Sequence, residues 1–180
     1  MPAIAVAALS ARLLAQATLQ AGLDVMALDV FGDADTIAAA TQWLPIGMTQ
    51  SLRIDASLFL ETLQALARQG RVQGWVAGAG FEGRPELLEQ GSANLPLFGT
   101  PGADVRRVRD PKKFFDALAE LRIAHPAVRL DPDASRAGWL VKDFAASGGT
   151  HIRRAESVGA QARVLLRAVS EREIRAVEDL

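Results

Sequence analysis

The sequence predicts an α/β fold, in which a Rossmann-like domain with a parallel sheet precedes a small α+β lobe and a helical C-terminal tail. Two observations support this prediction. Short apolar runs alternate with helix-like segments over the first half of the chain, which is the order expected when helices connect parallel strands. Apolar residues make up 49% of the 180 residues, enough to build a core on both faces of such a sheet.

The first two strand–helix repeats occupy the N-terminal part of the chain. Residues 4–9 form a short apolar run, as in a fully buried strand. Ser10 is placed to cap a helix over residues 11–21. A second buried strand is expected over residues 25–30, and Asp33 then lies at the start of a short alanine-rich helix.

Further helices and strands complete the predicted domain. Asp55 or Ser57 begins a longer helix whose leucines lie near helical spacing. A strand follows over residues 72–77, Pro85 sits in the first turn of a short helix, and residues 95–98 are expected to form one more strand. Parallel sheets bind ligands at the carboxyl ends of their strands, so the loops that follow these strands are candidate binding loops.

The sequence pattern changes after residues 99–102, which are rich in glycine and proline and therefore disfavour a continuous helix or strand. Asp110 and Pro111 supply a helix cap followed by proline at the first helical position, and this helix is expected to end near residue 121. The remaining expected elements are a strand at 138–141, a tight loop at 147–150 and a paired strand at 151–153.

The expected organisation therefore has three parts. They are a Rossmann-like domain at residues 1–98, a small α+β lobe at 103–155 and a helical tail at 156–180. The tail is rich in charged side chains and has few large apolar groups, so its helix is expected to attach only loosely to the rest of the chain.

Charge and cysteine content exclude several classes of function. The net charge is −1, which gives no general attraction to nucleic acid or to an anionic membrane surface. The chain has no cysteine, so disulfides, thiolate nucleophiles and cysteine-based zinc sites are ruled out. Its two histidines, His125 and His151, are far apart in sequence, and no His-rich metal site is expected.

The apolar N-terminus is interpreted as a buried strand rather than as a targeting signal. No basic segment precedes it, and the run is only about eight residues long. No stretch of the sequence approaches the roughly 20 apolar residues of a membrane span. The sequence thus predicts a cytoplasmic protein with no membrane and no nucleic acid among its partners.

The strand and loop around Lys142 are the strongest candidate for phosphate binding. Lys142 lies at the end of an apolar strand and supplies a positive charge. Four small residues follow in the next loop, namely Ser147, Gly148, Gly149 and Thr150. Glycines allow backbone N–H groups to approach phosphate oxygens closely. An ordinary hairpin with a lysine at the strand end is the alternative interpretation.

Lys112 and Lys113 lie at the start of the helix that Asp110 is expected to cap. A lysine is unfavourable there, because the helix dipole prefers negative charge at this end. The pair therefore indicates either a solvated surface or a site that binds an anion, and these residues alone leave both interpretations open.

The order of these motifs resembles that of the ATP-grasp family of carboxylate–amine ligases over about residues 1–155. The resemblance rests on Asp-Pro-Lys-Lys-Phe-Phe from Asp110, Ile-Ala-His-Pro ending at Pro126, Trp-Leu-Val-Lys ending at Lys142, and Ser-Gly-Gly from Ser147. It implies a Rossmann-like domain that leads into the small lobe of a nucleotide clamp.

The same resemblance implies an ATP site and a ligase reaction. In the family, a lysine at the helix start and a lysine on the following strand bracket ATP, and they correspond here to Lys113 (or Lys112) and Lys142. The loop at residues 147–150 corresponds to the glycine-rich loop over the β- and γ-phosphates. The reaction makes an acyl phosphate from a small-molecule carboxylate, which an amine then attacks; charge neutralisation and positioning provide most of the catalysis.

The sequence departs from the family pattern in two places. Ala145 or Ala146 stands where the family loop often has a glycine, which narrows the allowed backbone conformations. Intact relatives are expected to use Mg²⁺, yet no acidic and amide residues in the family's pattern follow Arg154, and no metal ligand is assigned. Truncation or a reading-frame change near residue 155 would explain this. The chain is then expected to be inactive alone, unless a partner chain or an oligomer completes it.

Acidic residues in the N-terminal domain leave other functions open. Asp29 lies where a dinucleotide-binding domain places its ribose-binding acid, although the first turn lacks Gly-x-Gly-x-x-Gly. Asp29, Asp33 and Asp35 are candidates for a cation site, and the alternative interpretations are a solvated loop and a helix cap. Residues 78–82, which end at Glu82, form either a substrate-facing loop or a structural turn. The alternatives are a non-catalytic Rossmann-like binding or regulatory module and an NAD(P)-linked enzyme.

Overall fold

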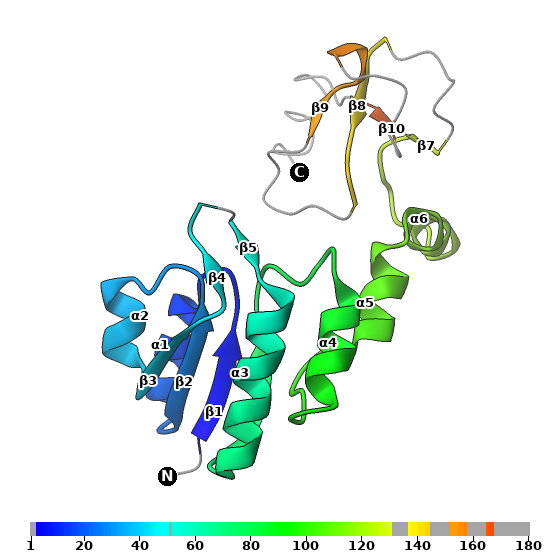
Figure 1. Cartoon of the computed structure of the whole chain (residues 1–180). Helices are drawn as coiled ribbons and strands as arrows, with labels where there is room; N and C mark the ends of the chain where they lie inside the picture. Colours follow the sequence, from blue (N-terminus) through cyan, green and yellow to red (C-terminus); the bar gives the residue numbers. More distant parts are fainter. Residues whose placement is uncertain (1–2, 51, 131–136, 145–151, 158–164, 168–180) are drawn as a thin grey trace. The chain divides into compact units, whose positions relative to one another are not determined.

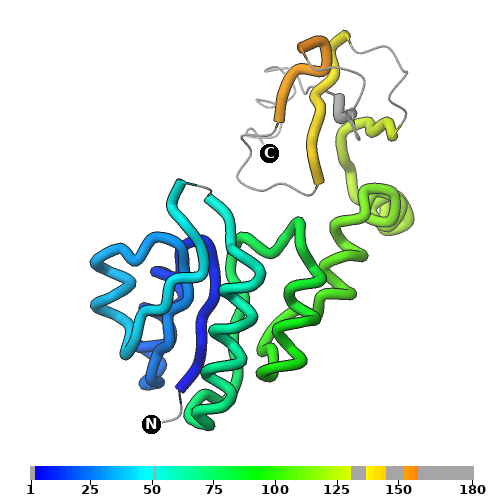
Figure 2. The backbone as a smooth tube through the Cα atoms, viewed as in Figure 1, coloured from blue at the N-terminus to red at the C-terminus, as the bar shows by residue number. Residues whose placement is uncertain are grey.

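A computed structural model describes residues 3–50, 52–130, 137–144, 152–157 and 165–167. The chain divides into two compact units, Met1–Arg106 and Arg107–Leu180, each with a sheet of its own. Figure 1 shows their helices and strands, and Figure 2 follows the backbone through the same elements. Within the described residues, no helix is long and apolar enough to span a membrane. The three expected parts, 1–98, 103–155 and 156–180, stay predictions.

The first unit is built on a four-stranded parallel sheet with the order β3–β2–β1–β6. Its strands are β1 (Ala3–Ala7), β2 (Asp24–Asp29), β3 (Gln42–Pro45) and β6 (Val72–Ala77). Its helices are α1 (Arg12–Gln20), α2 (Ala34–Ala39), α3 (Ala56–Gln69), α4 (Pro85–Ser92) and α5 (Gly102–Arg109), the last of which continues into the second unit. The predicted Rossmann-like parallel sheet is confirmed.

Alternate residues of the central strands point to opposite faces of the sheet, and a separate apolar cluster covers each face. Ala5 and Leu28 belong to the cluster on the side of α3, together with Phe59. Val6 belongs to the cluster on the side of α1, together with Ala15. Figure 1 shows α1 and α2 on one side of the sheet and α3 on the other. Because helices cover both faces, the ends of the strands are the place for binding loops.

Most of the expected helix ends are confirmed. The Asp33 carboxylate caps α2 by accepting a hydrogen bond from the backbone N–H of Thr36, and this bond lowers the pKa of Asp33. Asp55 caps α3 in the same way. Gly70 ends α3 with a φ of 68°, a left-handed conformation that glycine adopts without strain. Pro85 lies in the first turn of α4.

Ser10 does not cap α1, contrary to the prediction. The residue before the helix is Ala11, and no side chain provides a local cap there. The backbone N–H of Ala11 instead donates to Asp29 Oδ2 at 3.0 Å. A carboxylate from the neighbouring strand thus binds the backbone N–H of the residue that precedes the helix.

The sequence does not predict three short strands of the first unit. They are β3, β4 (Gly47–Met48) and β5 (Arg53–Ile54), of which the last two form an antiparallel pair. Such short segments carry too few residues to show a strand pattern. Conversely, the predicted strand at residues 95–98 is reduced to one parallel bridge with β6. A single bridge joins Leu97 to Trp75, and Pro96 has no backbone N–H to extend the pairing.

The second unit contains an antiparallel sheet with the order β7–β10–β8–β9. Its elements are α6 (Pro111–Glu120), β7 (Val128–Arg129), β8 (Trp139–Val141), β9 (Arg153–Arg154), the 3₁₀ helix η1 (Ala155–Ser157) and β10 (Leu165–Arg167). Asp110 caps α6, and Pro111 follows in its first turn, as predicted. The predicted small α+β lobe is therefore confirmed as a fold, although β9 lies slightly later than the expected strand at 151–153.

The expected helix over residues 156–180 is wrong at Leu165–Arg167. These residues form β10, which pairs with β7 on one side and with β8 on the other. Backbone hydrogen bonds to two neighbouring strands outweigh the weak helical pattern of an isolated segment. Residues 158–164 and 168–180 lie outside the described residues.

Candidate functional site

Asp29 lies at the carboxyl end of β2 and is fully buried. Its Oδ2 accepts a hydrogen bond from the backbone N–H of Ala11 at 3.0 Å. Its Oδ1 accepts two more, from the backbone N–H of Gly32 at 2.9 Å and from the indole Nε1 of Trp43 at 2.7 Å. The carboxylate therefore ties together the start of α1, the loop after β2 and strand β3, which indicates a structural role rather than ribose binding.

The packing around Asp29 supports this assignment. Gly32 has a φ of 57°, and a Cβ atom there would lie 2.6 Å from Cζ2 of the Trp43 ring. Only glycine therefore fits beneath the indole in this conformation. The conformation of the loop after β2 thus allows Trp43 Nε1 to reach the carboxylate. Asp29, whose position resembles that of a ribose-binding acid, therefore stabilises the fold.

The other two acids near β2 also have protein partners. Asp33 caps α2, and Asp35 lies 3.6 Å from the Arg12 guanidinium in an exposed ion pair. Among the residues that the structure describes, no three His, Cys, Asp or Glu side chains gather closely enough to hold a metal ion. The structure therefore gives no support to a cation site formed by Asp29, Asp33 and Asp35.

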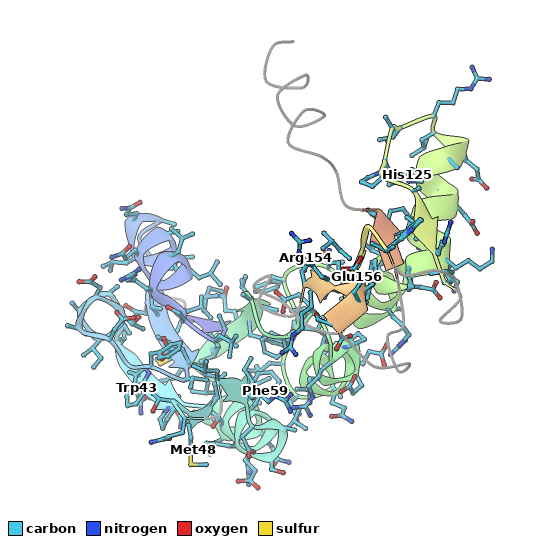
Figure 3. All side chains as sticks on the ribbon, turned by 90° about the horizontal axis from the view of Figure 1, so that it is seen from above. Trp43, Met48, Phe59, His125, Arg154 and Glu156 are labelled. Atoms are coloured by element: carbon cyan, nitrogen blue, oxygen red, sulfur yellow. The ribbon has the colours of Figure 1, made fainter. Side chains whose placement is uncertain are left out.

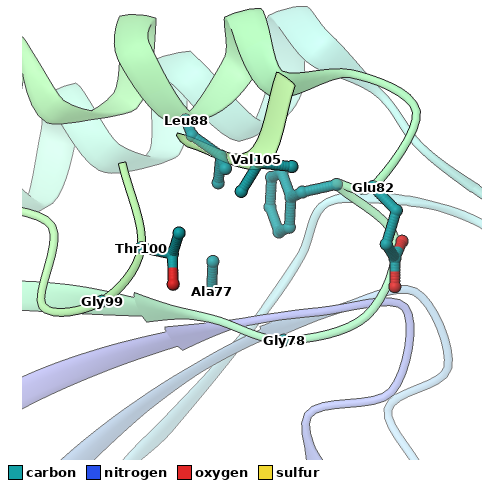
Figure 4. Close-up of a pocket in the computed structure, with 8 residues that line it drawn as sticks. Ala77, Gly78, Glu82, Leu88, Gly99, Thr100 and Val105 are labelled. Carbon is teal, nitrogen blue, oxygen red and sulfur yellow. The ribbon is translucent and has the colours of Figure 1, made fainter. Parts of the chain in front are cut away.

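A cavity of about 200 Å³ lies at the carboxyl end of β6. It is lined by Ala77, Gly78, Phe81, Glu82, Leu88, Gly99, Thr100 and Val105. Figure 4 shows Leu88 and Val105 across from Ala77 and Thr100, with Glu82 set apart on the loop that leaves β6. Sequence reasoning identified the loop but missed Leu88, Thr100 and Val105, because their approach depends on how α4 and α5 pack.

Glu82 presents a carboxylate at the rim of this largely apolar cavity. Its Oε2 accepts a hydrogen bond from the backbone N–H of Gly80 at 2.7 Å, and the Ala79 carbonyl accepts another from the Leu9 N–H at 2.7 Å. The loop is therefore an ordered turn. Oε1 of Glu82 has no protein donor within the described part of the chain. This arrangement suits a small ligand that combines an apolar group with an ammonium group.

The structure distinguishes Lys112 from Lys113, which the sequence could not do. Lys112 Nζ lies 2.6 Å from Asp116 Oδ2 one turn further along α6, and this hydrogen bond raises the pKa of Lys112. The backbone N–H of Lys113 donates to Asp110 Oδ1 at 3.1 Å, while its ammonium group has no partner among the described residues. Of this pair, Lys113 is thus the lysine whose ammonium group has no partner in the part of the chain that the structure describes.

Lys142 follows the last residue of β8 and is half-buried. Its Nζ lies 5.2 Å from the centre of the Phe144 ring, within the range of a cation–π interaction. A cation–π contact contributes about 0.5–1 kcal/mol at an exposed site and about 2 kcal/mol when desolvated, and a hydrogen bond to a charged group contributes about 1.5–3 kcal/mol. The ammonium group of Lys142 can therefore exchange the ring for an anion at little cost.

Aromatic rings connect the helix of Lys113 with the strand of Lys142. The Phe115 ring lies 6.2 Å from that of Phe144 and 5.1 Å from that of His125. None of the α6 residues is fully buried, so these ring contacts are an important part of how the helix packs within the unit. The predicted loop residues Ser147, Gly148, Gly149 and Thr150 lie outside the described residues.

Solved structures share this fold at low sequence identity. Biotin carboxylase from Campylobacter jejuni, in complex with an ATP analogue, superposes with a TM-score of 0.63 at 14% identity, over 94% of this chain and 45% of its own. The L-amino acid ligase from Bacillus licheniformis gives a TM-score of 0.58 at 14% identity, over 99% of this chain and 42% of its own. N5-carboxyaminoimidazole ribonucleotide synthetase from Thermus thermophilus gives 0.60 at 16% identity, over 93% and 47%.

These similarities confirm the predicted resemblance to ATP-grasp proteins at the level of the fold. The chain spans less than half the length of each of these three structures. No model of a protein family matches the sequence, and no curated protein matches it. The common fold is therefore shown by structure, while activity and substrates are matters for proposal.

Proposed function

We propose that this chain, which has the fold of the first part of ATP-grasp proteins, binds ATP and is related to the ATP-dependent carboxylate–amine ligases. The observation that carries the proposal is the position of Lys142. It is a half-buried cation at a strand end, its ammonium group contacts only an aromatic ring among the described residues, and the small-residue loop at 147–150 follows. Lys113 adds a second available cation from α6.

The chemistry of phosphate binding explains these features. Nucleotide phosphates carry several negative charges, and lysine ammonium groups neutralise them through charge-assisted hydrogen bonds. In the proposed reaction, a carboxylate oxygen attacks the γ-phosphorus, ADP leaves, and an amine then displaces phosphate from the acyl carbon. The role proposed for Lys113 and Lys142 is to bind and orient the phosphates during the first of these steps.

Magnesium is implied by the fold, since the biotin carboxylase domain of Hydrogenobacter thermophilus 2-oxoglutarate carboxylase was solved with MgADP and bicarbonate. The side chains in the described part of this chain do not gather into a metal site. We therefore assign no Mg²⁺ ligand in it. Inactivity of the chain alone, a completing partner chain and a cytoplasmic location stay predictions. The expected inactivity is tested by measuring phosphate release from MgATP by the pure protein, which should not exceed the rate in buffer.

The cavity at β6 is the proposed site for a small substrate of such a ligase. Its apolar walls include Leu88 and Val105, and Glu82 supplies the negative charge. An amine or amino acid with a small apolar side chain has matching chemistry, and a cavity of about 200 Å³ is smaller than the roughly 300–1,000 Å³ of typical ligand pockets, which favours a small molecule.

The ATP proposal predicts that Lys142→Ala weakens ATP binding by about tenfold or more, since a hydrogen bond to a charged group contributes about 1.5–3 kcal/mol. Isothermal calorimetry on the full chain measures this directly. Lys112→Ala is the matched control. The ammonium group of Lys112 is paired with Asp116, so this substitution should leave the affinity unchanged. Equal affinities for all three proteins would remove Lys142 from the site, and absence of binding to the wild type would refute the proposal.

The substrate proposal predicts a charge-dependent effect at Glu82. Small amines with apolar side chains should raise the melting temperature of the wild type, and Glu82→Gln should abolish the increase. Glutamine keeps an acceptor for the Gly80 N–H, so the turn should persist. Glu86→Gln is the control, since Glu86 is exposed and pairs with Arg84 at 3.4 Å. A stabilisation that survives in Glu82→Gln would exclude the carboxylate as the recognition group.

A further inference from the structure

The pairing of β8 with β9 determines which side chains share a face of the second sheet. Leu140 pairs with Arg154, and Val141 pairs with Arg153. Paired residues on neighbouring antiparallel strands point to the same face, and successive residues alternate between faces. Arg154 therefore lies on the face of Leu140. Lys142 follows the last residue of β8, and the alternation of that strand, continued by one residue, puts Lys142 on the same face. Arg153 lies on the opposite face.

One contact supports the alternation of faces along β8. Arg129 of β7 and Val141 of β8 are both paired with Leu165 of β10, so the register places them on one face. Trp139 belongs to the same face as Val141, since it is two residues away. The Arg129 guanidinium indeed stacks over the Trp139 ring at 4.2 Å. The face that carries Arg153 is thus the one with this stack, and Lys142 is on the other.

The backbone around Arg154 is held in place, whereas its guanidinium is exposed. The Arg154 carbonyl accepts a hydrogen bond from Ser157 Oγ at 2.8 Å, and the neighbouring Ala155 is fully buried. Glu156 Oε1 accepts from the backbone N–H of Gly138 at 3.1 Å, so it joins η1 to the start of β8. Figure 3 labels Arg154 and Glu156 on this segment. No described residue pairs with the guanidinium of Arg154.

We propose that Arg154 is a second phosphate-binding cation, which acts with Lys142 on the same face of the sheet. The inference rests on the proposed ATP binding and adds a residue that the sequence motifs do not contain. Continuing the β8–β9 register makes Arg154 a diagonal neighbour of Lys142, at about 7–8 Å, a separation that long side chains span. A guanidinium binds phosphate oxygens with two parallel hydrogen bonds, whereas the lysine acts as a point charge.

The test compares two adjacent arginines that differ in the face they occupy. Calorimetry on the full chain measures ATP, tripolyphosphate and adenosine binding to Arg154→Ala and Arg153→Ala. We expect Arg154→Ala to weaken ATP and tripolyphosphate binding at least fivefold, and Arg153→Ala to change either by less than twofold. Adenosine, which has no phosphate, should bind all variants equally. Arg154→Lys should recover part of the loss, and it also serves as the second variant if the alanine protein folds poorly.

The outcomes separate this inference from the proposed function. If Lys142→Ala weakens ATP binding but Arg154→Ala behaves like Arg153→Ala, the function stands and the role of Arg154 is refuted. If ATP does not bind but tripolyphosphate binds in a manner that depends on Arg154, the anion site stands without the nucleotide function. Equal effects of the two arginines on both ligands would show only general electrostatics and would also refute the inference.

Discussion

Replacing Asp29 with alanine is expected to lower the free energy of unfolding of the first unit by about 3 kcal/mol or more. The substitution removes the acceptor of three hydrogen bonds, from Ala11, Gly32 and Trp43. The Ala11 N–H is buried, so water cannot readily replace the carboxylate there. An unsatisfied buried donor costs about 1–3 kcal/mol, and the two part-buried donors add smaller costs.

Chemical denaturation followed by tryptophan fluorescence measures this loss, since Trp43 lies at the carboxylate. Asp35→Ala is the control, because its side chain is 64% exposed and its ion pair with Arg12 is at the surface. Surface pairs of this kind contribute at most about 1 kcal/mol. Asp29→Asn should fall between the two, since it keeps one acceptor oxygen but turns an amide N–H₂ toward a donor. A loss for Asp29→Ala no larger than the control's would revive the interpretation of Asp29 as a ligand-binding acid.

The case of Asp29 shows how far the sequence predicts this molecule. Apolar runs and helix caps are local signals, and they correctly predicted β1, β2, β6 and the starts of α2, α3 and α6. The role of Asp29 depends on residues 3 to 18 positions away in the chain, which the fold brings together. The sequence shows that Asp29 lies at the end of a strand, but it does not show which groups donate hydrogen bonds to its carboxylate.

The same limit applies to the candidate site. The motif with Lys113 and Lys142 was recognisable because each lysine sits at a local boundary of a helix or a strand. Lys112 pairs with Asp116, one helical turn away, and this contact between the two side chains is seen only in the structure. Arg154 was inferred from the β8–β9 register, which is a property of strand pairing and cannot be predicted from a local sequence pattern.

Short segments were the least predictable part of the fold. β4, β5 and β10 have two or three residues each, and their stability comes from pairing partners rather than from their own sequence. The helix expected around Leu165 illustrates this, because the observed strand gains hydrogen bonds from β7 and β8 on its two sides. The secondary structure of such short segments therefore depends on the strands with which they pair in the folded chain.

Replacing Phe59 with alanine is expected to destabilise the first unit by about 3–5 kcal/mol, the usual range for a buried phenylalanine. Phe59 is fully buried on α3, and its ring centre lies 5.2 Å from that of Trp75 and 5.1 Å from that of Phe81. Removing the ring leaves a cavity and eliminates two aromatic contacts. Denaturation with Trp fluorescence again gives the measurement. The neighbouring Leu58→Ala is the control, as its side chain is 38% exposed and should cost far less.

Water is not expected to reduce this cost. Trp75 Nε1 is buried and has no hydrogen-bond partner among the described residues, so a water molecule in the new cavity could accept one bond from it. A buried water needs two to four polar partners, and the surrounding aromatic and leucine side chains provide no others. The cavity should therefore stay empty and the full cost should be observed. Because Phe81 also lines the cavity beside Glu82, the same variant should weaken any amine-dependent stabilisation more than Leu58→Ala does. A Phe59→Ala protein that loses stability but keeps this ligand response would show that the aromatic core supports the fold without positioning the loop.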